Sequence, residues 1–395
     1  MELPASLINA VLGQQSLVQF PHALYRYPAR FSPHFAREVI EAFTSPGELV
    51  LDPFCGGGTA IVEALSLGRK AVGCDINTLA TYITKVKTTP LSVHDKRELI
   101  HWLQRFDTTI VKTAEPVGSW HDTCIPNLPW RMQLSLGQTL NLINQLPKTK
   151  QRDFARLTLL CVAQAALDCP RRVPKTRILW ADFKASLVRN LEHHQSYLTS
   201  MANQNAIARF QIRSLRRIIR RKAEAIGGCR LIPDSWLPAR LVLTSPPYAG
   251  VHVLYHRWQI NGRRETPLPY WLVGQRNGHG EGYFTLGSRR QPGLFSYFKR
   301  LQAAFTAIAS CLDGRSLVVQ LVAFNRPTEH LPMYLEALAN AGFAEEIIEC
   351  KHPSVIDGRL WRAVPGRKWY AHARRITGSS REVLLLHRLV ASNAR

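Results

Sequence analysis

Two short segments of this chain combine residue types and spacing that could do chemistry, and the first is a glycine-rich loop. Residues 52–59 read Asp-Pro-Phe-Cys-Gly-Gly-Gly-Thr and follow an apolar stretch, 48–51, that is typical of a buried strand. Glycines let the backbone pass close to a ligand, and the start of a following helix presents free N–H groups. The loop lacks the G-x-G-x-x-G pattern of dinucleotide folds and the lysine of phosphate loops. It therefore favours a ligand without a phosphate.

An acid follows this loop at a spacing that suits a ribose. Asp75 directly follows a second apolar stretch, 71–74. Its distance from Gly58 is close to the roughly 20-residue offset at which an acid binds ribose hydroxyls. A nucleoside with a ribose and no phosphate fits both features, and S-adenosylmethionine is the obvious one. For the glycines alone, a tight turn with a capping aspartate is an open alternative.

The second segment is Thr-Ser-Pro-Pro-Tyr at 244–248, directly after the apolar stretch 240–244. Pro246 and Pro247 cannot donate backbone hydrogen bonds and hold the chain extended, so their carbonyls are fixed acceptors. With the Ser245 hydroxyl and the Tyr248 ring, they suit a flat heterocycle that carries an exocyclic amine. Hydrogen bonds to both amine protons favour pyramidalisation and expose the nitrogen lone pair. A Pro-Pro turn that closes a strand is the alternative for this segment alone.

The elements that must position these segments follow an α/β pattern. A strand, the glycine loop, a helix ending near Gly68 and a second strand form half of a βαβ unit, which predicts a parallel sheet. Between 90 and 225 the strand signals fade, and a largely helical insertion is expected. Alternation then resumes. The predicted helices are 153–167, 205–224, 294–310 and 329–341, and the predicted later strands are 240–244, 316–322, 345–349 and 382–387.

The composition indicates which classes of protein and of binding partner are compatible with this chain. The chain has 395 residues, a formal charge of +23 and 46% hydrophobic residues, which excludes a disordered polybasic tail and favours a globular protein that meets a polyanion. No apolar run reaches the roughly 18 residues of a membrane span, and the N-terminus lacks a signal-peptide pattern, so a cytoplasmic protein is expected. The eight cysteines are scattered without zinc spacing, and no metal site is expected.

Two basic segments are candidates for contact with nucleic acid. Residues 151–230 hold 16 Lys and Arg against 5 acids. Five arginines recur there at three- and four-residue steps, which predicts one basic helical face, with an ordinary solvated face as the alternative. The long loop 252–290 mixes Gly, Arg and aromatic residues and could close over DNA, or could be an ordinary packed connection. The candidate contact residues are Arg213, Arg216, Arg217, Arg220 and Arg221 in the first segment and Arg257, Arg263 and Arg264 in the second.

Taken together, the motifs resemble the S-adenosylmethionine-dependent amino-methyltransferases of DNA. Residues 52–59 look like that family's cofactor loop, 244–248 like its catalytic tetrapeptide, and 27–31, Tyr-Pro-Ala-Arg-Phe, like the segment that closes over the methionine end of the cofactor. The resemblance covers about 25–90 and 226–388. It implies a Rossmann-like, seven-stranded, mostly parallel sheet and a direct methyl transfer from the sulfonium to an exocyclic nitrogen of a flipped base in double-stranded DNA.

The resemblance also implies roles for particular residues. Cofactor contacts are implied for Tyr27, Pro28, Ala29, Phe31, Asp52, Pro53, Phe54, Gly56, Gly58, Thr59 and Asp75, and catalytic roles for Ser245, Pro246, Pro247 and Tyr248. Relatives usually carry an acid for the cofactor adenine at the end of a strand before the catalytic one, and the stretch that matches here, 227–230, has none. Ser245 is typical of cytosine-N4 enzymes, whereas Asp or Asn at that place is typical of adenine-N6 enzymes.

These observations predict a site-specific DNA methyltransferase that favours N4 of cytosine and acts in a restriction–modification or related defence context. It would associate with the nucleoid through DNA, and a cognate restriction or defence component is a candidate partner. The methyltransferase core would comprise 1–90 and 226–395, with 91–225 as the DNA-binding insertion. Adenine-N6 methylation of DNA, base-amine methylation of RNA and non-catalytic nucleic-acid binding are the alternatives. Cytosine-C5 methylation is excluded because no cysteine follows a proline.

Overall fold

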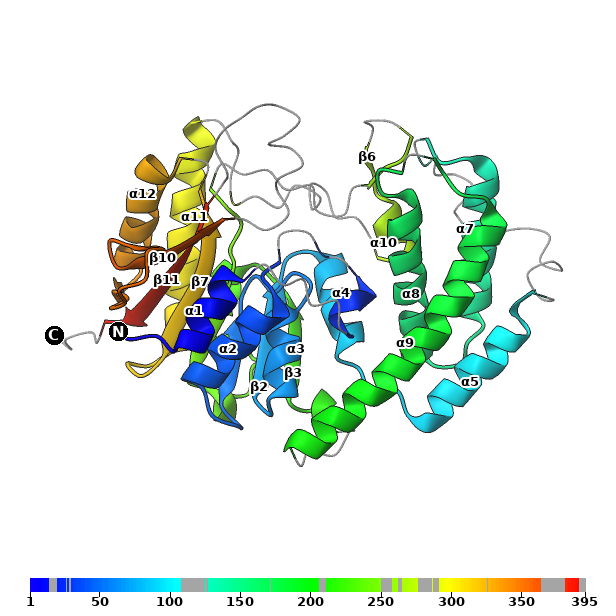
Figure 1. Ribbon diagram of the computed structural model, residues 1–395, viewed down its shortest axis with the longest axis horizontal. Coiled ribbons are helices and arrows are strands. Elements are labelled where there is room, and N and C mark those ends of the chain that lie inside the picture. The colour runs from blue at the N-terminus through cyan, green and yellow to red at the C-terminus, as the bar shows by residue number, and fades with distance from the viewer. Residues whose placement is uncertain are drawn as a thin grey trace.

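A computed structural model describes residues 1–13, 20–25, 27, 30–107, 125, 127–170, 172–205, 211–249, 258–261, 265–275, 286, 291–324, 326–363 and 381–390. Pro28, Ala29, Arg257, Arg263 and Arg264, named above as candidate site residues, lie outside these ranges. The described chain forms a sheet covered by helices on both faces and, beside it, a group of long helices (Figure 1).

The sheet confirms the predicted α/β, Rossmann-like fold class. Within the described residues it has nine strands in the order β3-β2-β1-β4-β7-β11-β10-β9, with β8 paired to β11. The neighbours from β3 to β7 are parallel, and β11 runs antiparallel to β7. The row from β3 to β10 has the seven strands expected, and the short β8 and β9 extend it. The strands are β1 (Leu49–Asp52), β2 (Lys70–Asp75), β3 (Arg216–Arg220), β4 (Leu241–Thr244), β7 (Leu317–Ala323), β8 (Phe343–Glu345), β9 (Val355–Ile356), β10 (Arg359–Ala363) and β11 (Arg381–Leu389).

The helices on the two faces bury alternate residues of the strands. In β1, Leu49 and Leu51 pack into one core with α11 and α12, while Val50 packs into the opposite core with α1, α2 and α3. This alternation is the period-2 pattern of a strand buried on both sides. The flanking helices are α1 (Ala5–Leu12), α2 (Pro33–Phe43), α3 (Thr59–Ser66), α4 (Thr78–Lys87), α11 (Gln291–Ala309) and α12 (Pro327–Asn340).

The helical part packs around a core that it shares with α4. It contains α5 (Val93–Gln104), α7 (Trp130–Asn144), α8 (Thr149–Leu167) and α9 (Thr176–Asn205), and α9 returns to the sheet beside β3 (Figure 1). The segment with β5 (Trp258–Gln259), β6 (Glu265–Thr266) and α10 (Leu268–Leu272) packs into the same core through Trp258 and Tyr270. Part of the long loop that follows the Ser-Pro-Pro-Tyr segment is therefore built into the helical part. No described helix is long and apolar enough to cross a membrane.

The predicted helix over 205–224 is wrong. The described part of this stretch contains strand β3, which pairs in parallel with β2, and Ile219 of β3 enters the core under α11. The periodicity of the arginines suggested a helix, but the local pattern cannot reveal that β2 has an open edge to which this segment pairs. The late strand expected at 345–349 is also misplaced, since β8 covers Phe343–Glu345.

Candidate functional site

The glycine loop makes the turn from β1 into α3 that its sequence predicts. Gly56 and Gly58 have φ angles of +48° and +75°, values that residues with a side chain rarely adopt. Helix α4 holds the loop from below, because Thr84 Oγ1 donates to the carbonyl oxygen of Gly56 and Lys87 Nζ to that of Gly57, each at 3.1 Å. The loop is thus fixed with one side turned toward the carboxyl edge of the sheet.

Two buried carboxyl groups flank this loop. Asp52 Oδ1 accepts from Thr244 Oγ1 at 2.7 Å and from the Phe54 N–H at 3.2 Å. The oxygens of Asp75 accept from the N–H groups of Gly56 and Asn77 at 2.9 and 2.8 Å. Burial raises the pKa of Asp52 to about 7 and that of Asp75 to about 6, although these hydrogen bonds act in the opposite direction. Both groups therefore titrate close to neutral pH.

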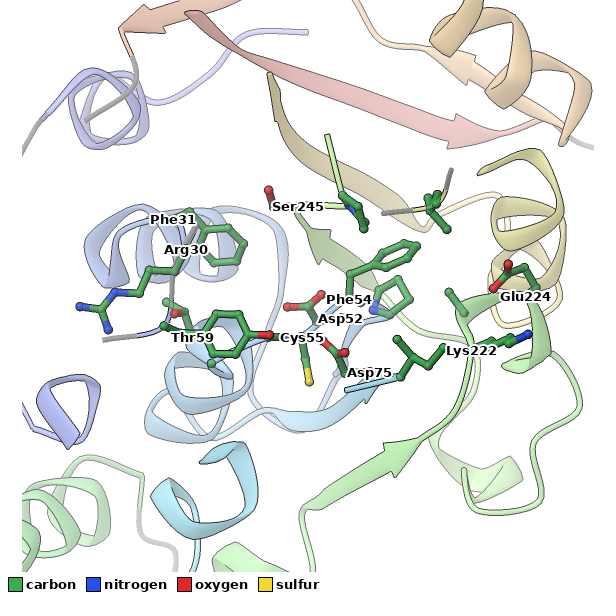
Figure 2. Close-up of a pocket in the computed structure, with 18 of the residues that line it drawn as sticks. Arg30, Phe31, Asp52, Phe54, Cys55, Thr59, Asp75, Lys222, Glu224 and Ser245 are labelled. Carbon is green, nitrogen blue, oxygen red and sulfur yellow. Dashed lines mark hydrogen bonds between the residues drawn. The ribbon is translucent and has the colours of Figure 1, made fainter. Parts of the chain in front are cut away.

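A pocket opens beside the loop at the carboxyl ends of β1, β2 and β4, which is where parallel sheets bind ligands. In Figure 2, Asp52, Phe54 and Asp75 lie at its centre, Phe31 lies on one side, and Glu224 on the other. Of the residues predicted from sequence, those that line it are Tyr27, Phe31, Asp52, Pro53, Phe54, Gly56, Thr59, Asp75, Ser245 and Pro247, whereas Gly58, Pro246 and Tyr248 do not. The two chemical segments, separated by almost two hundred residues, meet at this pocket.

Three pocket residues that the sequence analysis missed come from the segment just after β3. Lys222, Ala223 and Glu224 line the pocket opposite Phe31, and Glu224 belongs to a short 3-10 helix, Ala223–Ala225. The stretch 227–230 was the wrong place to look for an acid, because the strand ends at Arg220 and 227–230 lies in turns. The paired isoleucines at 218 and 219 were the signal that could have revealed this strand.

The Ser-Pro-Pro-Tyr segment is held from two sides. Ser245 Oγ has two acceptors, the carbonyl oxygen of Leu321 on β7 at 2.8 Å and Tyr248 Oη at 3.3 Å. Tyr248 Oη donates to Glu382 Oε1 on β11 at 2.9 Å. Tyr297 of α11 donates to the carbonyl oxygen of Pro247 at 2.7 Å. The hydroxyls of Ser245 and Tyr248 and the carbonyl of Pro247 therefore have fixed orientations.

The five arginines predicted to form one helical face do not do so. Arg216 is buried on β3 and donates to Thr89 Oγ1 at 2.8 Å, and its burial lowers its pKa to about 10. Arg217 lies over the ring of Trp236, 4.6 Å from the ring centroid. The exposed members are Arg213, Arg220 and Arg221. Among the residues that the structure describes, no group of three or more His, Cys, Asp or Glu side chains is arranged to hold a metal ion.

The chain has a Rossmann-like α/β fold in which a glycine loop after β1, an acid at the end of β2 and a proline-rich segment after β4 meet at one pocket. Residues 12–86 match the model of a family described as DNA methylase, with N6 and N4 amino-methyltransferases as its members. Over this segment the chain is similar to the DNA amino-methyltransferases, a family whose enzymes use S-adenosylmethionine.

Curated relatives also match over short spans of the chain. The Type II methyltransferase M.MvaI of Kocuria varians is 38% identical over 76 residues, which cover 18% of this chain and 17% of the relative. The tRNA (guanine(10)-N2)-dimethyltransferase of Methanocaldococcus jannaschii is 34% identical over 89 residues, covering 22% and 24%. Among solved structures, an rRNA methyltransferase of Streptomyces viridochromogenes covers 94% of this chain at 10% identity, with a TM-score of 0.33. The aligned segments thus span less than a quarter of these curated relatives.

Proposed function

We propose that this protein is an S-adenosylmethionine-dependent DNA methyltransferase that modifies an exocyclic amine, with N4 of cytosine as the favoured target. The observation that carries the proposal is the orientation of Ser245 at the pocket. Its hydroxyl group has two acceptors within the protein, the carbonyl oxygen of Leu321 and Tyr248 Oη, so its proton is engaged there and toward the pocket the serine oxygen acts as an acceptor. An amine proton is the partner that such an oxygen suits.

The residues around the pocket fit the cofactor of the family. Backbone N–H groups fix both oxygens of Asp75, which leaves their remaining lone pairs for the two ribose hydroxyls. Phe54, Ile76 and Ala223 offer apolar surface for the adenine ring, and Glu224 an acceptor for its amine. Tyr27 and Phe31 would hold the methionine end. When bound, the cofactor supplies an electrophilic methyl group on a positively charged sulfonium, and the carboxyl groups of the pocket favour that charge.

The proline-rich segment would activate the target amine. Ser245 accepts one amine proton, and a main-chain carbonyl of Pro246 or Pro247 accepts the other, with Tyr297 holding that of Pro247 in place. The nitrogen lone pair then forms the bond to the methyl carbon while the carbon–sulfur electrons return to sulfur, and one amine proton leaves to solvent. The chain needs no nucleophile of its own, and burial raises the pKa of the nearby Cys55 thiol well above its ordinary value.

The base must leave the duplex to reach this pocket, at a cost of a few kcal/mol. Stacking on Tyr248, worth about 1–3 kcal/mol, would offset part of that cost, and phosphate contacts the rest. Of the predicted arginines we retain Arg213, Arg220 and Arg221, which are exposed, and place Arg216 in the interior of the fold. The helical part, together with the 258–275 segment that packs into it, would supply the other contacts. We also propose that the protein acts on nucleoid DNA in the cytoplasm, together with a restriction or defence component.

The test is methyl transfer from labelled S-adenosylmethionine to duplex DNA or to bulk RNA, followed by mass spectrometry of the released nucleosides. N4-methylcytosine from DNA is expected, and its loss in a Ser245→Ala variant would assign it to this site. N6-methyladenine alone would overturn the cytosine preference.

The second candidate function is RNA methylation, which the similarity to the tRNA guanine-N2 enzyme favours. Label in RNA alone would select it. No label in either nucleic acid, with binding unchanged in the Ser245→Ala variant, would instead indicate a non-catalytic binding protein. Where label does enter DNA, sequencing of the methylated bases at single-base resolution would give the recognition sequence.

A further inference from the structure

The hydroxyl of Tyr248 is anchored by a buried ion pair that connects three distant parts of the chain. Tyr248 Oη donates to Glu382 Oε1 at 2.9 Å, and Glu382 Oε2 accepts from Arg362 Nε and Nη2 at 2.7 and 2.6 Å. Arg362 Nη1 also donates to the carbonyl oxygen of Val11 near the end of α1, at 2.9 Å. Glu382 and Arg362 are each 6% exposed. The tyrosine thus contacts a carboxylate that two strands and a helix hold in place.

This arrangement fixes the direction of the tyrosine hydrogen bond as well as its position. A carboxylate that is paired with an arginine can only accept, so the Tyr248 proton is committed to Glu382. The Ser245 hydroxyl in turn donates within the protein, to the carbonyl oxygen of Leu321 and to Tyr248 Oη. Because the Tyr248 proton is directed to Glu382, Tyr248 Oη can accept the Ser245 proton, and Ser245, which lines the pocket, acts as an acceptor toward a bound base. Acceptors suit the amine of cytosine or adenine and repel the keto oxygen that replaces it in uracil or hypoxanthine.

We infer that Glu382, held by Arg362, is a positioning residue that orients the Tyr248 hydroxyl and so makes the site selective for amino over keto bases. This inference rests on the proposed function and deepens it. Glu382 does not contact the reacting atoms but acts through Tyr248. Its contribution is both the fixed plane of the ring on which the base stacks and the polarity of the hydroxyl at the ring's edge.

The experiment compares Glu382→Gln with the wild-type protein and with a matched control, Glu345→Gln. Glu345 forms a similar two-bond pair with Arg359 in the same sheet, at 2.6 Å for each bond, but lies outside the pocket. The substrate is a DNA duplex that contains the recognition sequence identified by sequencing of the methylated bases. Affinity is also measured for the same duplex with uracil in place of the target cytosine, or hypoxanthine in place of a target adenine. Differential scanning fluorimetry checks that each variant folds.

Because a mismatched base leaves the duplex at a lower cost, the ratio of the amino to the keto affinity is compared between proteins, and the control should have the same ratio as the wild type. A glutamine amide can donate to Tyr248 as well as accept from it, so Glu382→Gln should reduce that ratio several-fold and lower kcat at least tenfold, with the affinity for S-adenosylmethionine unchanged. Tyr248→Phe should lose the same preference, and combining it with Glu382→Gln should add no further loss, because both changes act through the same Tyr248–Glu382 hydrogen bond.

An unchanged ratio and kcat in Glu382→Gln, or losses that multiply in the double variant, would overturn the inference while leaving the methyltransferase proposal intact. A wild-type protein that methylates no DNA would instead refute the proposed function. If Glu382→Gln does not fold, the pair is replaced by Glu382→Met with Arg362→Met, which leaves no unpaired buried charge. The same loss of preference is expected there, and its retention would equally refute the role of Glu382.

Discussion

Replacement of Asp52 by asparagine should stabilise the ligand-free protein at high pH. The Asp52 side chain is 2% exposed and its carboxyl group accepts hydrogen bonds from Thr244 and from the Phe54 N–H, both of which an asparagine oxygen can also accept. Burial raises the pKa of this carboxyl group from an ordinary value of 3.8 to about 7. The ionised form therefore costs stability that the neutral amide does not.

The direction of the effect follows from proton binding. Between pH 4 and 7 the unfolded chain has released the Asp52 proton while the folded chain retains it, so rising pH favours unfolding. The stability associated with this group is fully present below pH 4 and is lost as the pH rises through about 7. At 1.36 kcal/mol for each unit of pKa, the loss is about 4 kcal/mol. Water that enters the pocket would reduce this figure, which makes it an upper bound.

The assay is the melting temperature of wild-type and Asp52→Asn protein from pH 4.5 to 8. An unfolding entropy of about 2.1 cal/mol/K per residue gives roughly 0.8 kcal/mol/K for a chain of this length, so about 4 kcal/mol corresponds to roughly 5 °C. The variant should melt up to about 5 °C above the wild type at pH 8 and show little gain at pH 4.5. Asp182→Asn, at an exposed position on α9, is the control and should show no such pH-dependent gain. Parallel pH profiles of variant and wild type would refute the reasoning.

Three further expectations concern ligand binding. S-adenosylmethionine should bind more tightly at pH 7.5 than at pH 5.5 in calorimetric titrations, because the two pocket carboxyl groups of raised pKa ionise over this range and favour a cationic ligand; a pH-independent Kd would contradict this. Gly57→Ala should weaken cofactor binding about tenfold or more, since a Cβ there would come within 2.7 Å of Tyr27. The control is Gly314→Ala, where a Cβ would have no atom within 4 Å, and this variant should bind the cofactor as the wild type does. Arg220→Ala should lower the slope of log DNA affinity against log salt concentration by about one, because Arg220 is exposed. Arg216→Ala should lower the melting temperature and leave that slope unchanged, because Arg216 is buried. The reverse result would restore Arg216 as a phosphate contact.

The sequence by itself determined the parts of this protein whose structure is set by neighbouring residues. The glycines at 56 and 58 adopt the positive φ angles of a tight loop, and the apolar stretches on either side form β1 and β2. The Ser-Pro-Pro-Tyr segment follows β4 as predicted, because proline fixes its own backbone and that of the residue before it. Loop chemistry of this kind depends on a few adjacent residues and can be recognised without knowing the fold.

Only the tertiary structure decided which distant residues join these segments. Strand β3 forms because its backbone pairs with the open edge of β2, and this pairing brings Glu224 to the pocket. Glu382 reaches Tyr248 from 134 residues away because β11 lies antiparallel beside β7. Neither partner has a local sequence signal, since a strand pairing or a buried ion pair depends on what the folded chain places opposite each residue. The two candidate chemical segments could therefore be predicted from the sequence. The residues that orient them were determined by the packing of the sheet.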